Sequence, residues 1–153
     1  MHIVLVEPEI PGNTGNIARL CAAEHLTLHL VEPLGFQIDD KHLKRAGLDY
    51  WDLLDVHVHP NYDSVVRMLA GHHFYLNTTK AIRSYTDISY DGDDVLVFGK
   101  ETKGLPEELL RSHKEDCIRI PMIEEARSLN LSNAVAIVAM EAMRQLKSIS
   151  WHR

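Results

Sequence analysis

Cysteines, aromatic side chains and long apolar runs are all scarce in this sequence. Its 153 residues include two cysteines, Cys21 and Cys117, too few for a disulfide framework and without a C-x-x-C spacing. Aromatic residues make up 7%, and no run of 18 apolar residues occurs, so no membrane-spanning helix is expected. The start, MHIVLVEPEIPG, has neither the basic head nor the cleavage site of a signal peptide. We therefore expect a cytoplasmic protein, with no membrane partner, in which both cysteines are reduced packing residues.

Positive charge is scarce as well. Lysine and arginine total 16 against 22 acidic residues, a formal net charge of −6. This balance argues against blanket nucleic-acid binding, although a local basic patch can still contact phosphates. The 45% of apolar and 25% of charged residues are ordinary globular values. With no linker or low-complexity tract to divide the chain, we predict a single domain over residues 1–153.

Short runs rich in Val, Ile and Leu alternate with helical patterns along the chain. This alternation is typical of parallel strands joined by crossover helices and predicts an α/β fold with a parallel sheet. The predicted strands span residues 2–6, 27–31, 56–59, 73–77, 95–98 and 118–120, and the predicted helices 14–24, 40–46, 63–70, 106–112 and 132–147. We expect Asn13, Pro106, and Ser132 or Asn133 at helix starts.

The last predicted helix is unusually apolar. Every residue from Ala134 to Met140 is apolar, and polar residues return only from Glu141 onward. A helix that is apolar all round must be buried all round. Because a terminal helix in a small domain rarely has its own core on every side, we predict a homodimer in which a partner covers it. The alternative is a central helix covered on all sides within one chain.

Three polar loops carry the remaining signal, at residues 13–19, 99–106 and 127–133. The third joins a strand end to the apolar helix, and its serines and asparagines can start a helix or hydrogen-bond a polar ligand. None of the loops has the spacing of a dinucleotide-binding fingerprint or a P-loop. The ten histidines lack an H-E-x-x-H motif or an acidic companion set, and G-x-S-x-G is absent, so neither a metal site nor a serine hydrolase is predicted.

Taken together, the loops resemble the three motifs of the SPOUT RNA methyltransferases, and within them the small bacterial tRNA (cytidine/uridine-34-2′-O)-methyltransferases. The matching stretches are EPEIPGNTGNIARLCA at 7–22, VFGKETKGLP at 97–106 and IRIPMIEEARSLNLSNAVA at 118–136, with a subgroup-like segment at 29–51. Two positions depart from the pattern: Lys100, where proline is expected, and Asn77, where an apolar residue is usual.

The resemblance implies a SPOUT fold whose C-terminal third forms a deep trefoil knot, and an obligate dimer. It further implies bent S-adenosylmethionine held by the knot loops, with no metal, and tRNA as the substrate, methylated on the ribose 2′-hydroxyl of the wobble nucleotide.

The resemblance also suggests catalytic residues. Arg19 stands in the place of the family's catalytic arginine, which reaches into the partner's cofactor site and is proposed there as the base. Because a guanidinium does not deprotonate in proteins, we expect Arg19 to orient the hydroxyl and a neighbouring phosphate instead. Asn13, Glu101 and Asn130 would organise the loops around it.

The ligand-binding residues follow from the same motifs. Predicted cofactor contacts are backbone and apolar groups at Gly99, Ile120, Met122 and Leu129, with polar contacts from Asn77 and Ser128. Predicted RNA contacts are Lys41, Lys44 and Arg45, which share one helical face, and Arg127. Without the resemblance, that basic stretch would be read as a solvated face.

Two other functions stay open at this point. One is the same chemistry on ribosomal RNA or another tRNA position, although a chain without an added RNA-binding domain favours a small accessible loop. The other is a non-catalytic RNA-binding or cofactor-sensing dimer, which the presence of Arg19, Glu101 and Asn130 disfavours.

Overall fold

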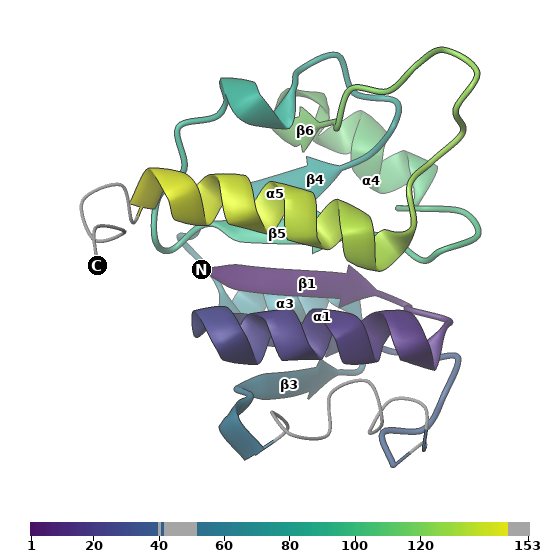
Figure 1. Ribbon diagram of the computed structural model, residues 1–153, viewed down its shortest axis with the longest axis vertical. Coiled ribbons are helices and arrows are strands. Elements are labelled where there is room, and N and C mark those ends of the chain that lie inside the picture. Colours follow the sequence, from purple (N-terminus) through teal and green to yellow (C-terminus); the bar gives the residue numbers. More distant parts are fainter. Residues whose placement is uncertain (40, 42–51, 147–153) are drawn as a thin grey trace.

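A six-stranded parallel sheet forms the centre of the molecule (Figure 1). The structure is a computed structural model that describes residues 1–39, 41 and 52–146. The strands are β1 (His2–Val6), β2 (Thr27–Val31), β3 (Val56–His59), β4 (Phe74–Asn77), β5 (Val95–Phe98) and β6 (Cys117–Ile118). The helices are α1 (Pro11–Glu24), α3 (Tyr62–Met68), α4 (Glu107–Ser112) and α5 (Leu131–Leu146), with 3-10 turns η2 (Tyr85–Asp87) and η3 (Lys114–Asp116). The strand order is β3-β2-β1-β5-β4-β6, and all pairs are parallel.

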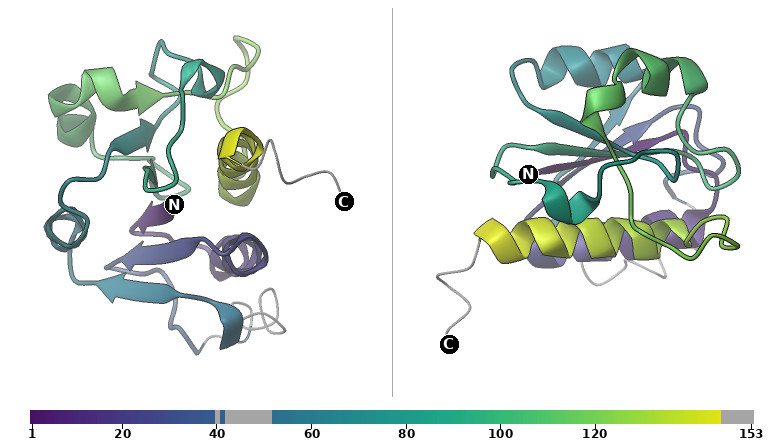
Figure 2. Two further views of the ribbon diagram at one scale, coloured as in Figure 1. Left: turned by 90° about the vertical axis from the view of Figure 1, so that its left-hand side faces the viewer. Right: turned by 90° about the horizontal axis from the view of Figure 1, so that it is seen from above.

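Helices cover both faces of the sheet. Figure 2 shows α1 and α5 side by side on one face, with α3 and α4 on the other. Alternate residues of each central strand enter two separate cores: Leu5 and Leu96 pack toward α1 and α5, whereas Val4 and Val97 pack toward the opposite side. Burial on both faces explains why the strands are continuous apolar runs rather than alternating ones.

The strand order reverses direction at the centre of the sheet. After β1 the chain builds outward through β2 and β3, then crosses to place β4, β5 and β6 beyond the other side of β1. In open parallel sheets, ligands bind outside the carboxyl ends of the strands near such a reversal. The fold therefore directs attention to the loops that follow β1, β4, β5 and β6.

The chain beyond β6 is tied to the loop that follows β4. The Thr78 N–H donates to Ile118 O, the Arg119 N–H to Arg83 O, and the Tyr85 N–H to Arg119 O, each at 2.9 Å. Later, the Gln145 side chain on α5 accepts from the Tyr90 N–H at 3.0 Å and donates to Ile88 O at 3.0 Å. The segment 78–90 thus contacts both ends of the path from β6 to α5.

Histidines form a hydrogen-bonded row on the sheet face that also carries Val4. His2 Nδ1 lies 3.0 Å from His29 Nε2, and His29 Nδ1 lies 3.0 Å from His59 Nε2. The His57 ring stacks on His29 at a centroid distance of 5.2 Å. Burial and these neighbouring imidazoles lower the pKa of His29 to about 3. His29 is therefore a neutral ring at neutral pH.

The predicted α/β class is confirmed, and a strand is present at each of the six predicted places. The strand predicted at 118–120 is wrong in extent, because Arg119 pairs with the 83–85 loop instead of continuing beside β4. Starting at Pro11, α1 follows the N-cap Ile10, so the prediction of Asn13 as a helix start is wrong. Pro106 is the N-cap of α4 rather than its first residue. The helix predicted at 40–46 falls almost wholly outside the described residues.

Helix α5 buries one face within the chain and leaves another uncovered. Val135, Val138 and Ala139 are fully buried, whereas Ile137 keeps 37% of its surface exposed. The alternative of a helix covered on all sides within one chain is therefore wrong. In the chain by itself, an apolar strip of α5 faces outward.

Candidate functional site

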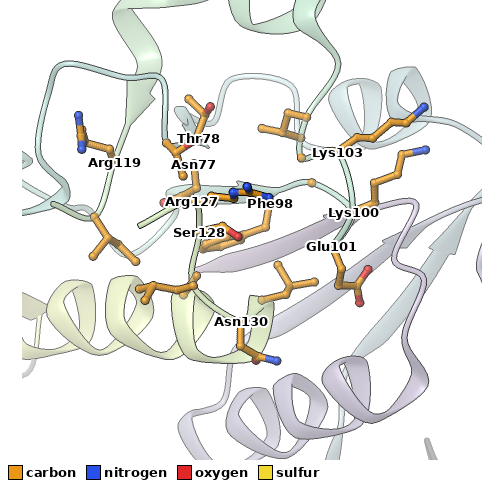
Figure 3. A pocket seen from close by; sticks show the side chains of 18 of the residues that line it. Asn77, Thr78, Phe98, Lys100, Glu101, Lys103, Arg119, Arg127, Ser128 and Asn130 are labelled. Atoms are coloured by element: carbon orange, nitrogen blue, oxygen red, sulfur yellow. The ribbon is translucent and has the colours of Figure 1, made fainter. Parts of the chain in front are cut away.

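A pocket of about 550 Å³ opens at the carboxyl ends of β4, β5 and β6 (Figure 3). Its volume is within the usual range for a small-molecule site. The apolar part of its wall comprises Ile10, Phe98, Leu105, Leu110, Ile118, Ile120, Met122, Leu129, Leu131 and Ala134. The polar part includes Asn13, Asn77, Thr78, Thr79, Ser128 and Asn130, with six charged residues among the rest. The pocket therefore suits a ligand with both apolar and hydrogen-bonding parts.

The Glu101 carboxylate joins two of the polar loops. Its Oε2 accepts from the Glu9 N–H at 2.8 Å, and its Oε1 accepts from the Ile10 N–H at 3.0 Å and from Asn13 Nδ2 at 3.3 Å. These donors lie just before and within the first turn of α1, where backbone N–H groups have no intrahelical partner. Glu101 satisfies them from 91 and 92 residues away in sequence.

Asn130 connects the third loop to the same network. Its Nδ2 donates to Asn13 Oδ1 at 3.0 Å, and its Oδ1 accepts from the Ser132 N–H at 2.9 Å and from the Asn133 N–H at 3.4 Å. Those two contacts are the N-capping interactions of α5, so the prediction of Ser132 or Asn133 as the cap is wrong. Asn130 thus starts the last helix and also closes the chain of contacts from Glu101 through Asn13.

Two acidic residues after β1 bind side chains and backbone of the loop at 99–106, which follows β5. Glu9 Oε1 accepts from Thr102 Oγ1 at 2.6 Å and from the Thr102 N–H at 3.1 Å, and these hydrogen bonds lower the pKa of Glu9. Lys100 Nζ lies 2.6 Å from Glu7 Oε2, and this contact raises the pKa of Lys100. Lys100, which departs from the family pattern, is therefore held by a specific partner.

Gly99 meets a steric requirement of the chain in addition to its predicted role. We predicted that Gly99 contacts the cofactor through its backbone. A Cβ at position 99 would lie 2.0 Å from the Gly104 carbonyl carbon and 2.2 Å from the Leu105 nitrogen. The chain folds back here, with the Gly104 N–H donating to Lys100 O at 2.9 Å, and leaves no room for a side chain. Gly99 does line the pocket, as predicted.

Asn77 brings an unsatisfied acceptor to the pocket. Its Nδ2 donates to Val97 O at 3.2 Å, while its buried Oδ1 has no hydrogen-bond partner within the described part of the chain. An unmatched buried oxygen costs on the order of 1–3 kcal/mol. A ligand that brings an N–H group to this point would remove that cost.

The structure places most of the predicted site residues at this pocket. Those that line it are Asn13, Asn77, Gly99, Glu101, Ile120, Met122, Arg127, Ser128, Leu129 and Asn130. Arg19 does not line it: this residue lies on the exposed side of α1, six residues or about 9 Å along the helix from Asn13. Lys41 is exposed and away from the pocket, and Lys44 and Arg45 lie outside the described residues.

Several residues that line the pocket were not predicted from the sequence. Thr78, Thr79, Lys80, Lys103 and Arg119 line the pocket, but their motif positions gave no sign of it. Thr78 and Thr79 follow directly on β4, so the carboxyl-edge rule alone could have indicated them.

Within the described residues, no group of three or more His, Cys, Asp or Glu side chains could hold a metal ion. No helix in this part of the chain has the length and apolar character needed to cross a membrane.

The fold and the site together define an α/β protein with a pocket for a small amphipathic ligand, built from interlocked loops at the carboxyl edge of a parallel sheet. The model of the SpoU rRNA Methylase family matches residues 1–140. The chain therefore belongs to this family.

Several known proteins are similar over nearly the whole chain. A tRNA (cytidine(34)-2′-O)-methyltransferase from Methylovorus glucosotrophus is 50% identical over 144 residues, covering 94% of each chain. A solved structure from work on the 2′-OH methylation of C/U34 on tRNA is 42% identical, with a TM-score of 0.92 and 96% of each chain covered. The AdoMet-bound SpoU methyltransferase AviRb of Streptomyces viridochromogenes is 26% identical, with a TM-score of 0.83, covering 97% of this chain and 61% of AviRb.

Proposed function

We propose that this protein is an S-adenosylmethionine-dependent methyltransferase that modifies the ribose 2′-hydroxyl of the wobble nucleotide, cytidine or uridine 34, in tRNA. The carrying observation is the pocket in which three polar loops are locked together by Glu101, Asn13 and Asn130. Its relatives, at 50% identity or close to it, are named for this reaction.

The uncharged residues of the pocket fit S-adenosylmethionine. Asn77 offers a buried acceptor without a partner, suited to an amino group of the ligand. Ile120, Met122 and Leu129 supply apolar wall, and Ser128 an exposed hydroxyl beside it. When bound, this cofactor supplies an electrophilic methyl group on a positively charged sulfur.

The chain's own task is to place the attacking oxygen and to handle its proton. The ribose 2′-oxygen forms the new bond to the methyl carbon, the carbon–sulfur bond breaks with its electrons passing to sulfur, and the hydroxyl proton leaves. An in-line geometry for this displacement depends on positioning. Arg19 would hold the hydroxyl and an adjacent phosphate, and that phosphate is a candidate acceptor for the proton.

A homodimer would bring Arg19 to the site. The exposed position of Arg19 on α1, away from its own pocket, supports a role at the pocket of a second copy. Ile137 on the neighbouring helix α5 supports the same arrangement, because a partner would cover its exposed apolar surface.

A C-terminal trefoil knot is part of the proposal. It is supported by the contacts of segment 78–90 with both Arg119, just after β6, and Gln145 on α5. If the C-terminal part of the chain is threaded through the loop formed by residues 78–90, these contacts would hold it on either side of the loop.

The test is ribose methylation by the purified protein. Wild type incubated with tRNA and S-adenosylmethionine should produce a 2′-O-methyl group at nucleotide 34, detected by mass spectrometry of nuclease digests. Arg19→Ala should lower turnover by at least about 100-fold, the scale of losing a positioned catalytic group, while S-adenosylhomocysteine affinity is retained. Arg67→Ala on α3 is the charge-matched control. Methylation at another position or on ribosomal RNA would replace the wobble assignment, and no methylation of any RNA would overturn the enzyme function.

A further inference from the structure

The charged residues of the pocket wall are mostly positive. Five cationic side chains line the pocket against a single carboxylate, that of Glu101: Lys80, Lys100, Lys103, Arg119 and Arg127. Such a balance stands out in a chain whose formal net charge is −6.

Two of these cations already have carboxylate partners. Lys100 pairs with Glu7 at 2.6 Å, and Lys80 pairs with Glu107. The Glu101 carboxylate is itself occupied by two backbone N–H groups and the Asn13 amide. The carboxylates of Glu7, Glu101 and Glu107 therefore already have partners.

The other three cations form no ion pair within the part of the chain that the structure describes. Each comes from a different stretch: Lys103 from the loop after β5, Arg119 from the position just after β6, and Arg127 from the loop before α5. Among the residues that the structure describes, the buried Nε atom of Arg119 has no hydrogen-bond partner. In Figure 3, Arg119 and Lys103 lie on opposite sides of the pocket, with Arg127 between them.

The proposed cofactor does not match this charge. At neutral pH, S-adenosylmethionine has a sulfonium and an ammonium against one carboxylate, so its net charge is positive. Three unpaired cations therefore disfavour its entry, whereas its demethylated product, which lacks the sulfonium charge, is penalised less. A polyanion is the ligand that such a wall attracts.

Resting on the proposed function, we infer that Lys103, Arg119 and Arg127 form a clamp for the RNA phosphates beside the target nucleotide. The same clamp weakens binding of the positively charged cofactor until RNA neutralises it. RNA and S-adenosylmethionine therefore bind with positive coupling, and free enzyme holds the demethylated product relatively more tightly. Linkage requires the coupling to be reciprocal.

The first experiment measures RNA binding without catalysis. An anticodon stem-loop RNA is titrated at several salt concentrations against wild type and the variants Lys103→Gln, Arg119→Gln and Arg127→Gln. Each variant should bind about 3- to 10-fold more weakly and lower the salt slope by about one. The variants Lys103→Arg and Arg127→Lys, which keep the charge, should bind nearly as wild type, and Arg67→Gln controls for a distant charge. Wild-type affinity and slope in all three Gln variants would overturn the clamp.

The second experiment measures cofactor binding by calorimetry. The Kd ratio of S-adenosylmethionine to S-adenosylhomocysteine should fall by about threefold in Arg127→Gln, and likewise in wild type saturated with the stem-loop RNA. An unchanged ratio in both cases would refute the coupling.

A third ligand, 5′-methylthioadenosine, tests the competing explanation that Arg127 binds the carboxylate of the cofactor. If Arg127→Gln weakened the binding of S-adenosylhomocysteine but not that of 5′-methylthioadenosine, which lacks the amino-acid carboxylate, Arg127 would be a cofactor contact and the clamp would be wrong.

These outcomes are separate from failure of the proposed function. If wild type did not methylate nucleotide 34 but the Gln variants still lost RNA affinity, the clamp would stand and the wobble assignment would fall.

Discussion

Of the two glycines that line the pocket, Gly99 has the more stringent steric requirement, because an added Cβ at Gly104 would meet no atom within 4 Å. Replacing Gly99 with alanine would place a methyl group within about 2 Å of the backbone at residues 104 and 105, well inside contact distance. We expect Gly99→Ala to lower the free energy of unfolding by about 1–3 kcal/mol and to displace the loop that holds Glu101. Urea unfolding and calorimetric titration with S-adenosylhomocysteine measure the two effects.

Gly12 provides the matched control. An added Cβ at this position would meet no atom within 4 Å, and the residue lies in α1, so Gly12→Ala should keep or slightly raise stability. Equal unfolding free energies for Gly99→Ala and wild type would show that the turn relaxes without cost.

The partners of individual site residues were the least predictable part of the site. The motif around Glu101 marked it as functional, but its contacts with Glu9 and Ile10 cross more than 90 residues of sequence. The same holds for Lys100 and Glu7. Local pattern identifies side chains capable of such contacts, whereas the choice of partner depends on how the strands are ordered in the sheet.

At the scale of secondary-structure elements, the row of histidines across β1, β2 and β3 predicts an acid-sensitive sheet. Burial, followed by the neighbouring imidazoles of His2, His59 and His57, holds the pKa of His29 at about 3, below its ordinary 6.5; the Asp55 charge opposes this shift. The folded state therefore binds a proton at His29 more weakly than the unfolded state does. The resulting stability is fully present above pH 6.5 and is lost as the pH falls toward 3.

This linkage gives a measurable slope. Between pH 7.5 and pH 5, His29 should account for a loss of about 2 kcal/mol in the free energy of unfolding. His29→Gln should start less stable but take up about one proton fewer on unfolding at pH 5. Urea melts of wild type, His29→Gln and the exposed control His113→Gln provide the comparison. A pH slope for His29→Gln identical to that of wild type would exclude the row as its source.

Element boundaries followed the sequence where local signals were strong and departed from it where long-range pairing intervened. Proline at the first position of α1 set its start at Pro11, ahead of the predicted Asn13. The strand predicted at 118–120 was shortened because Arg119 pairs with the distant 83–85 loop. The pairing of Arg119 with that loop depends on the three-dimensional arrangement of the chain and cannot be predicted from the hydrophobic pattern.

At the scale of the whole molecule, the outward strip of α5 predicts that the protein assembles as a dimer. Ile137→Lys should give a folded monomer, because a charge replaces an apolar side chain that is 37% exposed in the single chain. Light scattering coupled to size-exclusion chromatography measures the mass, and circular dichroism the fold.

Val66 on α3 offers a control of similar exposure, 41%, on the other face of the sheet. Val66→Lys should remain dimeric. If Ile137→Lys were also dimeric, the dimer interface would have to lie on another face. If wild type were monomeric at micromolar concentration, the dimer proposal would be wrong.

The contacts of Asn13 with both Glu101 and Asn130 also determine when the pocket can form during synthesis of the chain. These residues come from α1, from the loop after β5 and from the position just before α5, so no early portion of a growing polypeptide can hold the pocket in shape. A nascent chain paused on the ribosome before residue 130 has emerged would have most of its sheet and yet lack a competent cavity. The pocket can therefore take its final shape only after the loop before α5 has been synthesised.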